Sequence, residues 1–284
     1  MTVRARELAA LVDAVPSLPA VFLRLTAVVD DPRSAIRDME EVVYEDPALA
    51  GRLLRLANSA YFGFPGHVDS LSRAITLVGT RQLRDLALAT SVLDLFSGVA
   101  SDVVSMASFW RHSVATGLLA RALATWQREA NAEQFFVAGL LHDIGRLVLL
   151  IKANESMVQA LERSRVDDVL LHVVERDILG FDHAALGNEL LRQWNLPPAI
   201  CAGVAFHHLP MRAGANIPTA ALVHVADVMA NAIAFGSSGM DAVPPLEDAA
   251  WLALGLPVSV IKPSLDLVRQ QFSDTMKIMM EPAG

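Results

Sequence analysis

An adjacent histidine and aspartate, His142 and Asp143, lie inside a mostly apolar segment, GLLHDIGRLVLL. Burying an ionised carboxylate beside an imidazole costs free energy unless a partner compensates the charge. A divalent or trivalent metal ion is an effective partner, because Fe, Mn, Zn and Mg accept imidazole nitrogen or carboxylate oxygen as ligands. Alternatively, Asp143 forms an ion pair with an arginine such as Arg111, and His142 is a hydrogen-bonded core histidine. The segment alone leaves both interpretations open.

Further side chains able to bind a metal recur along the chain, and six of its eight histidines fall between positions 112 and 208. Metal sites of helical proteins are built from several helices that contribute one or two ligands each. Neighbouring residues lie about 100° apart on a helix, so adjacent histidines can share a site only at a helix end, which Pro210 provides. The predicted metal ligands are His112, His142, Asp143, His183, His207, His208 and Asp227.

Three other polar residues lie near these positions. His224 precedes Asp227 by three residues, so we expect it to share that helix face as a core histidine or as support for a ligand. His172 lies between an apolar and a charged segment, which favours the protein surface. Glu175 either orients a ligand or is solvated.

The spacing of apolar residues indicates that helices carry these side chains. Apolar residues recur at helical spacing, whereas alternating β-branched runs bounded by hairpin dipeptides are nearly absent. Asp46 before Pro47 marks a helix start, with Arg52 expected to point outward, and Gly79 separates two further helices. We predict an all-α protein whose later helices lie near 106–128, 133–151, 154–163, 167–178, 183–194, 198–208, 219–235 and 246–280.

A short segment of small and polar residues, 97–105, is the expected boundary between two helical subdomains. It is too short and too rich in valine for a flexible linker, so the two subdomains are expected to pack on each other. We expect an N-terminal helical half over 1–100, a second helical half over 101–240 and a C-terminal helical extension over 241–284.

The composition limits the class of protein. Hydrophobic residues make up 53% of the 284, enough to bury a core, and the single cysteine, Cys201, fits a reducing compartment. The net charge of -8 argues against a general polyanion binder. The mean hydropathy is high, at +0.40, but charged residues interrupt every apolar run of roughly 18 residues, and residues 1–16 do not resemble a signal peptide. We therefore expect a cytoplasmic protein without membrane association.

Ordered motifs over about residues 10–235 resemble an HDOD domain, an output-type module related to the HD superfamily. The motifs are LPAVFLRL at 18–25, DPALAGRLLRLANSAYFG at 46–63, SRAITLVG at 72–79, FWRHS at 109–113 and GLLHDIGR at 139–146. The resemblance implies that the second helical half is an HD-superfamily bundle. It also implies a bacterial signal-transduction module that acts through protein or small-ligand binding.

The order of the predicted ligands is similar to that of HD-superfamily phosphohydrolases, particularly the HD-GYP cyclic di-GMP phosphodiesterases. This chain departs from their pattern at three places. Arg146 stands where that family has a lysine, Ser108 stands where a glutamate would complete a bridged centre, and the residues after His208 lack the GYP signature. Arginine does not reproduce the compact charge of lysine. The resemblance therefore implies a metal site without implying cyclic-dinucleotide hydrolysis.

Three functions follow from these patterns. The first is a regulatory module, with signalling proteins and a small phosphorylated ligand or nucleotide as partners and without an organic cofactor. The second is a metal-dependent phosphohydrolase in which Asp143 has a catalytic role and Arg111 and Arg146 contact substrate. The third is DNA binding through residues 74–88, which superficially resemble a helix-turn-helix. Asp85 and the acidic net charge disfavour nucleic acid as a partner.

Overall fold

A computed structural model describes the chain except for residues 1–7, 9, 14, 241 and 282–284. The described residues form α-helices and short 3-10 helices, and no strand occurs among them. The prediction of an all-α protein is confirmed. Most of the N-terminal residues on which the signal-peptide expectation depends lie outside this description.

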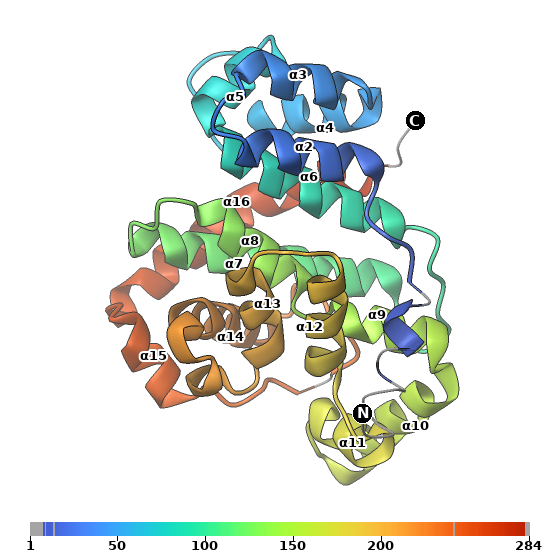
Figure 1. The fold of residues 1–284 in the computed structure, drawn as a ribbon. Helices are drawn as coiled ribbons and strands as arrows, with labels where there is room; N and C mark the ends of the chain where they lie inside the picture. The colour runs from blue at the N-terminus through green and yellow to red at the C-terminus, as the bar shows by residue number, and fades with distance from the viewer. Residues whose placement is uncertain (1–7, 9, 14, 241, 282–284) are drawn as a thin grey trace.

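The first layer of the fold consists of the helices at the top of Figure 1. They are α2 (Ala20–Asp30), α3 (Ile36–Tyr44), α4 (Pro47–Ala57), α5 (Leu71–Val78) and α6 (Thr80–Leu95). Their apolar faces meet through fully buried leucines such as Leu25, Leu53 and Leu71. Burial of these faces stabilises short helices that would be marginal in isolation.

The start of α4 follows the predicted chemistry, but its outer face does not. Asp46 accepts two backbone N–H groups of the first turn, and Pro47 is the first helical residue. Arg52, expected to point outward, is 2% exposed and donates to the Asp94 carboxylate and to the carbonyl of Glu281. The prediction was wrong because the C-terminal residues of the chain cover this face of α4.

The second group of helices surrounds α7, which packs against α8 and α14. These helices are α7 (Met106–Trp126), α8 (Ala132–Leu141), α9 (Ile144–Lys152), α10 (Asn154–Asp167), α11 (Leu171–Leu179), α12 (His183–Gln193), α13 (Pro198–Phe206) and α14 (Ile217–Ala232), with the 3-10 turns η1 (Pro210–Arg212) and η2 (Gly214–Asn216) before α14. In Figure 1 they form the lower part of the molecule.

The helix predicted over 133–151 is in fact two helices, so this prediction was wrong. α8 ends at Leu141 and α9 begins at Ile144, with His142 and Asp143 between them. Consecutive side chains on a continuous helix diverge by about 100°. The break allows the His142 and Asp143 side chains to face one site.

The C-terminal residues, predicted to be helical over 246–280, contact both groups of helices. They form α15 (Asp248–Leu254), η3 (Val258–Val260) and α16 (Ile261–Met280). Gly255 ends α15 in the left-handed conformation, with φ 63°. α16 packs against α7 and also contacts α4 and α6, and Gln271 donates to the carbonyl of Tyr61. The division into 1–100, 101–240 and 241–284 remains a prediction.

One helical stretch, Ala132–Lys152, is long and apolar enough to cross a membrane by length and composition. Within the fold 89% of the apolar 18-residue window of this stretch is buried, as expected for a core helix. The pair Asp248–Leu254 and Val258–Met280 meets the same criterion only when taken together, across a bend of 86°. Neither observation by itself indicates a membrane span.

α9 and α12 approach each other closely at Gly145. A Cβ atom there would overlap the backbone carbonyl oxygen of His183 and lie 2.9 Å from the backbone nitrogen of Gly187. Both atoms belong to the backbone of α12, so neither can move without displacing the helix. This crossing brings Asp143, two residues before Gly145, against the first turn of α12.

We predict that Gly145→Ala lowers the thermal midpoint of unfolding, because overpacking of this kind costs about 1–3 kcal/mol or more. The matched control is Gly98→Ala, since a Cβ at Gly98 meets no atom within 4 Å. Thermal unfolding followed by circular dichroism measures both variants. Equal midpoints for the two would show that the crossing is not as tight as described.

Candidate metal centre

The seven predicted ligands converge on one site between the helices of the second group. His112 lies on α7, His142 and Asp143 join α8 to α9, His183 begins α12, His207 and His208 follow α13, and Asp227 lies on α14. All of them except His208 are at most 4% exposed. The chain thus brings together side chains that lie far apart in sequence and largely excludes water from them.

The first ligand group consists of His112, His142 and Asp227. His142 Nε2 lies 3.3 Å from His112 Nε2 and 3.5 Å from Asp227 Oδ1. His112 Nε2 lies 3.1 Å from the same carboxylate oxygen. Asp143 adjoins this group, since its Oδ2 lies 3.2 Å from His142 Nε2.

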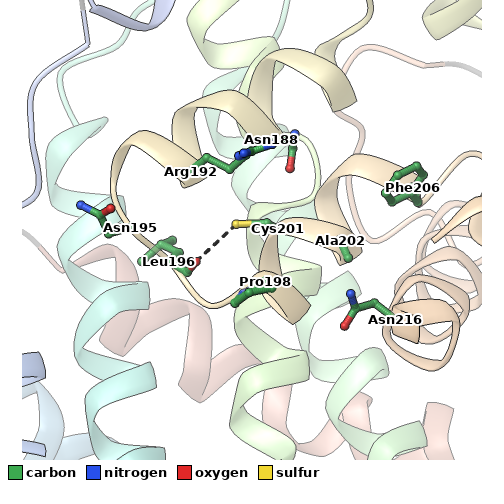
Figure 2. A pocket seen from close by; sticks show the side chains of 9 residues that line it. All are labelled: Asn188, Arg192, Asn195, Leu196, Pro198, Cys201, Ala202, Phe206 and Asn216. Atoms are coloured by element: carbon green, nitrogen blue, oxygen red, sulfur yellow. Dashed lines mark hydrogen bonds between the residues drawn. The ribbon is translucent and has the colours of Figure 1, made fainter. Parts of the chain in front are cut away.

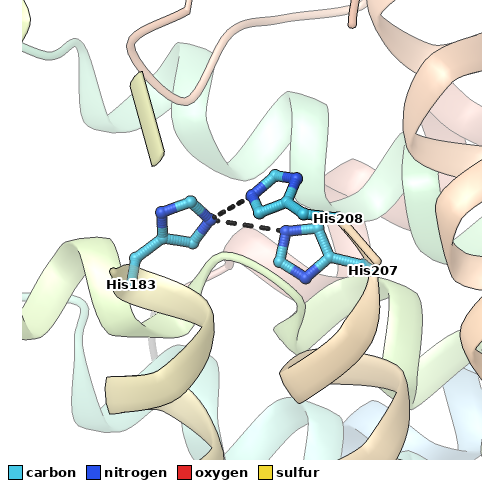
Figure 3. Close-up of side chains that lie close together, drawn as sticks. All are labelled: His183, His207 and His208. Atoms are coloured by element: carbon cyan, nitrogen blue, oxygen red, sulfur yellow. Dashed lines mark hydrogen bonds between the residues drawn. The ribbon is translucent and has the colours of Figure 1, made fainter. Parts of the chain in front are cut away.

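The second ligand group consists of His183, His207 and His208, whose rings point toward one another in Figure 3. His183 Nε2 lies 3.3 Å from His207 Nε2 and 3.0 Å from His208 Nε2. Asp143 Oδ1 lies 3.0 Å from His183 Nε2 and 3.8 Å from His207 Nε2. Asp143 therefore stands between the two groups, presents one oxygen to each, and forms a third, overlapping group with His142 and His207.

Two of the histidine rings are aimed by hydrogen bonds to the backbone. Nδ1 of His142 donates to the carbonyl of Gly139, and Nδ1 of His207 donates to the carbonyl of Val204, both at 2.7 Å. In each case the acceptor lies three residues earlier, in the last turn of the preceding helix. When the ring is neutral and the proton is on Nδ1, Nε2 carries a lone pair that points at the centre.

Glu175, on α11, orients His183. Its Oε2 lies 2.6 Å from His183 Nδ1 and also accepts the backbone N–H of His183 at 2.8 Å. The Glu175 side chain is fully buried. Of the two roles considered from the sequence, orientation of a ligand is therefore the one that the structure supports. Carboxylates placed in this way hold metal-binding histidines in the required tautomer.

Arg146 is the ion-pair partner of Asp143. Its Nη1 donates to Asp143 Oδ2 at 2.8 Å and also to the hydroxyl of Ser238, and its Nε lies 3.8 Å from Glu175 Oε1. The side chain is 1% exposed. The guanidinium is thus held inside the protein by the carboxylates of Asp143 and Glu175 and by the hydroxyl of Ser238.

Arg111, considered as an alternative partner for Asp143 and as a substrate contact, lies apart from the ligand groups. Its Nε donates to the carbonyl of Phe235, and its guanidinium lies over the ring of Phe272, 5.1 Å from the centroid. One turn earlier, Ser108 Oγ accepts the backbone N–H of Ser237 at 2.9 Å. Both residues hold the segment after α14 against α7.

Burial and charge shift the pKa values of the centre in opposite directions. Burial raises the pKa of Asp143, but Arg146 and the imidazoles hold it well below its usual range. Burial likewise raises the pKa of Asp227. Hydrogen bonds from His112 and His142 lower this pKa by more than burial raises it, so the net shift is downward. Burial lowers the pKa of His142, yet the two carboxylates outweigh it and raise this pKa to about 10. Both carboxylates therefore stay ionised, and the site favours positive charge.

The residues present fit a metal ion. Asp143 Oδ1 is buried and makes no hydrogen bond. Burial, together with the charges of His142 and His183, lowers the pKa of His207 to about 3, so its ring is neutral and its Nε2 lone pair faces the same space. A carboxylate oxygen without a donor beside an imidazole lone pair is costly to bury unless a cation is shared between them. The chemistry of these donors is that of a transition-metal or magnesium site.

His172, expected at the surface, is buried beside the second ligand group. Its ring stacks on that of His208, with centroids 3.9 Å apart and planes 17° apart. The side chain is 9% exposed, and its Nδ1 has no hydrogen-bond partner. The surface prediction was wrong because local hydropathy gives no sign that α11 lies against the end of α13.

His224 lies outside the ligand groups and supports a ligand, which is one of the two roles predicted for it. Its Nδ1 donates to the carbonyl of His207 at 2.8 Å, and its Nε2 accepts the backbone N–H of Glu247 at 2.9 Å. These bonds fix the backbone that carries His207. They also tie the segment before α15 to the site.

Comparison of the chain with known protein families identifies the family to which it belongs. Residues 15–210 match the HDOD domain, and this match covers most of the chain. The chain belongs to the HDOD family. This HDOD protein is 27% identical over 205 residues to an uncharacterized protein of Treponema pallidum (strain Nichols). The match covers 72% of this chain but 39% of that protein, so this chain spans well under half the length of its curated relative.

Solved structures share the HDOD fold along nearly the whole chain. A candidate phosphohydrolase from Shewanella amazonensis SB2B is 25% identical, with a TM-score of 0.74 over 96% of this chain and 97% of that chain. An HDOD domain protein of unknown function from Geobacter sulfurreducens is 23% identical, with a TM-score of 0.75 over 99% and 97%. A candidate signal transduction protein from Marinobacter aquaeolei VT8 is 20% identical, with a TM-score of 0.75 over 98% and 65%.

We predict that Glu175→Gln weakens Mn²⁺ binding by about 10–100-fold, because His183 loses the carboxylate that fixes its ring. The measurement is a titration of Mn²⁺ into chelator-treated protein by isothermal calorimetry. Glu189→Gln, at an exposed position of α12, is the matched control. Equal affinity of the two variants would mean that Glu175 does not orient a metal ligand.

Proposed function

We propose that this HDOD protein is a signal-transduction regulatory module, and that its two ligand groups bind one or two ions of Fe, Mn, Zn or Mg. It acts by binding signalling proteins or a small ligand rather than by turnover. The observation that carries this proposal is the burial of Arg146, whose guanidinium is engaged by Asp143 and Ser238. An arginine held in this way is not available to bind the phosphate of a substrate.

The family and its structural neighbours support a signalling role. The family match covers most of the chain, and the Marinobacter neighbour is a candidate signal transduction protein. A cytoplasmic location fits the single cysteine, Cys201, and the burial of Ala132–Lys152 within the fold. A regulatory module of this kind has protein partners, which we propose to be other signalling proteins.

A metal-dependent phosphohydrolase is the second candidate, favoured by the position of Asp143 between the two ligand groups. The Shewanella neighbour described above is a candidate phosphohydrolase, and a second solved structure from Shewanella amazonensis SB2B, 20% identical with a TM-score of 0.68, is a candidate metal-dependent phosphohydrolase. Bound ions would lower the pKa of a water molecule and polarise a phosphate. In this case Asp143 would hold the ions, and Arg146 would have to leave Ser238 to reach a substrate.

DNA binding has little support from the helices that could carry it. α6 would be the recognition helix of a helix-turn-helix, but its residues from Leu86 to Leu93 are buried. It could enter a major groove only by breaking its contacts with the rest of the protein. Arg84 is paired with Asp85 and Asp30, so its charge is already compensated. Proteins and small ligands therefore remain the proposed partners.

The first test of this proposal is elemental analysis of protein purified without added metal or a nickel column. We expect near-stoichiometric Fe, Mn or Zn in the wild type and its loss in His142→Ala/Asp143→Ala, because that variant removes a ligand of the first group and the carboxylate that faces both groups. Circular dichroism checks that the variant is folded. Absence of metal from the wild type, also after incubation with Fe²⁺, Mn²⁺ and Zn²⁺, would overturn the proposed metal centre.

A second test separates the regulatory module from the phosphohydrolase. We expect no turnover of bis-p-nitrophenyl phosphate by the metal-loaded protein with Mn²⁺ or Fe²⁺, because the Arg146 guanidinium is engaged by Asp143 and Ser238 and is not available to bind the phosphate. Hydrolysis that disappears in Asp143→Ala but persists in the surface variant Glu189→Gln would replace the regulatory proposal with the enzymatic one.

A further inference from the structure

A pocket of about 510 Å³ lies beside the hairpin formed by α12 and α13, and none of the predicted metal ligands is among its lining residues. Its volume is within the range of small-molecule sites, about 300–1,000 Å³. The segment that connects the two helices forms part of its wall, with Leu196 and Pro198 as apolar lining. Ala202, in the middle of α13, extends this apolar surface.

Three asparagine side chains that line the pocket have no hydrogen-bond partner among the described residues. Asn188, Asn195 and Asn216 surround it, as Figure 2 shows. Among the described residues, none of the three side-chain amides makes a hydrogen bond to another protein group. Each amide offers two donors and one acceptor. Three such groups with free donors and acceptors around one concavity are an arrangement suited to a polar ligand rather than to an apolar peptide.

One charged side chain and one aromatic side chain in the lining restrict the class of ligand that the pocket can bind. Arg192 supplies the positive charge of the lining, no acidic residue lines the pocket, and no ion pair involves Arg192 within the described part of the chain. Its charge acts on the buried thiol of Cys201, whose pKa burial raises and Arg192 lowers. Phe206 adds an aromatic ring at the other side of the pocket.

We propose that this pocket binds a nucleoside monophosphate. Arg192 would pair with its single phosphate, since a guanidinium matches phosphate oxygens in a bidentate arrangement. The asparagine amides would bond the edge of the base, as asparagine does with adenine. Phe206 and the apolar residues would contact the face of the base, a contact that every base can make.

This site is distinct from the metal centre, although both use the same two helices. His183 begins α12, whereas Arg192 lies nine residues later, about 13 Å along the helix axis. His207 and His208 follow the end of α13, whereas Cys201 and Ala202 lie in the middle of this helix and Phe206, its last residue, is the lining residue next to His207 in sequence. Nucleotide binding at the pocket therefore requires no metal and stands independently of the function proposed for the centre.

The test is calorimetric titration of AMP and GMP into the full chain, in the presence of EDTA. We expect saturable 1:1 binding of at least one nucleotide, and at least tenfold weaker binding to Arg192→Ala and to Asn188→Ala/Asn216→Ala. Arg73→Ala removes an exposed arginine on α5 and should bind like the wild type. Inorganic phosphate in place of the nucleotide should bind at least tenfold more weakly, since it lacks a base.

A second readout uses Cys201, the only cysteine of the chain and part of the pocket lining. Saturating nucleotide should slow alkylation of Cys201 by iodoacetamide at least fivefold in the wild type and not in Arg192→Ala, as followed by intact-protein mass spectrometry. The proposal is overturned if neither nucleotide binds in EDTA, if Arg192→Ala binds as tightly as Arg73→Ala, or if bound nucleotide leaves the alkylation rate unchanged.

Discussion

The ionised carboxylate of Asp143 is the constraint on which the arrangement of the second helical group depends. It is 2% exposed, so water cannot compensate its charge and the protein must do so. Arg146 compensates one oxygen, while the other faces the imidazoles of the second ligand group without a hydrogen bond. The break between α8 and α9 and the close crossing at Gly145 both bring this carboxylate to its position.

An arginine in place of lysine changes what the charge can do. The planar guanidinium of Arg146 reaches Asp143 and Ser238 and lies near Glu175, three partners from three different parts of the chain. A lysine ammonium is a compact point charge on a flexible stem and lacks this fixed fork. Arg146 therefore joins α9, α11 and the segment after α14 into one wall of the centre.

The sequence was sufficient to predict the helical class and to name residues that the fold brings together. Carboxylates and imidazoles in otherwise apolar helices are costly unless they meet, which is why positions as distant as His112 and Asp227 could be grouped. The division into two ligand groups could not be predicted, because it depends on how helices cross. The errors at Arg52 and His172 share one cause: amphipathic spacing describes a helix by itself and not the segment that covers it. The break at His142 carries no proline to mark it.

Residues of the centre also complete the ends of the helices that carry it. The last turn of a helix leaves carbonyl groups without donors, and the first turn leaves N–H groups without acceptors. His142 and His207 cap the carbonyls of Gly139 and Val204, and Glu175 caps the first N–H of α12. Each such bond contributes about 1 kcal/mol net. The same side chains therefore face the metal centre and cap helix ends. Their capping bonds would stabilise the fold even without a bound metal ion.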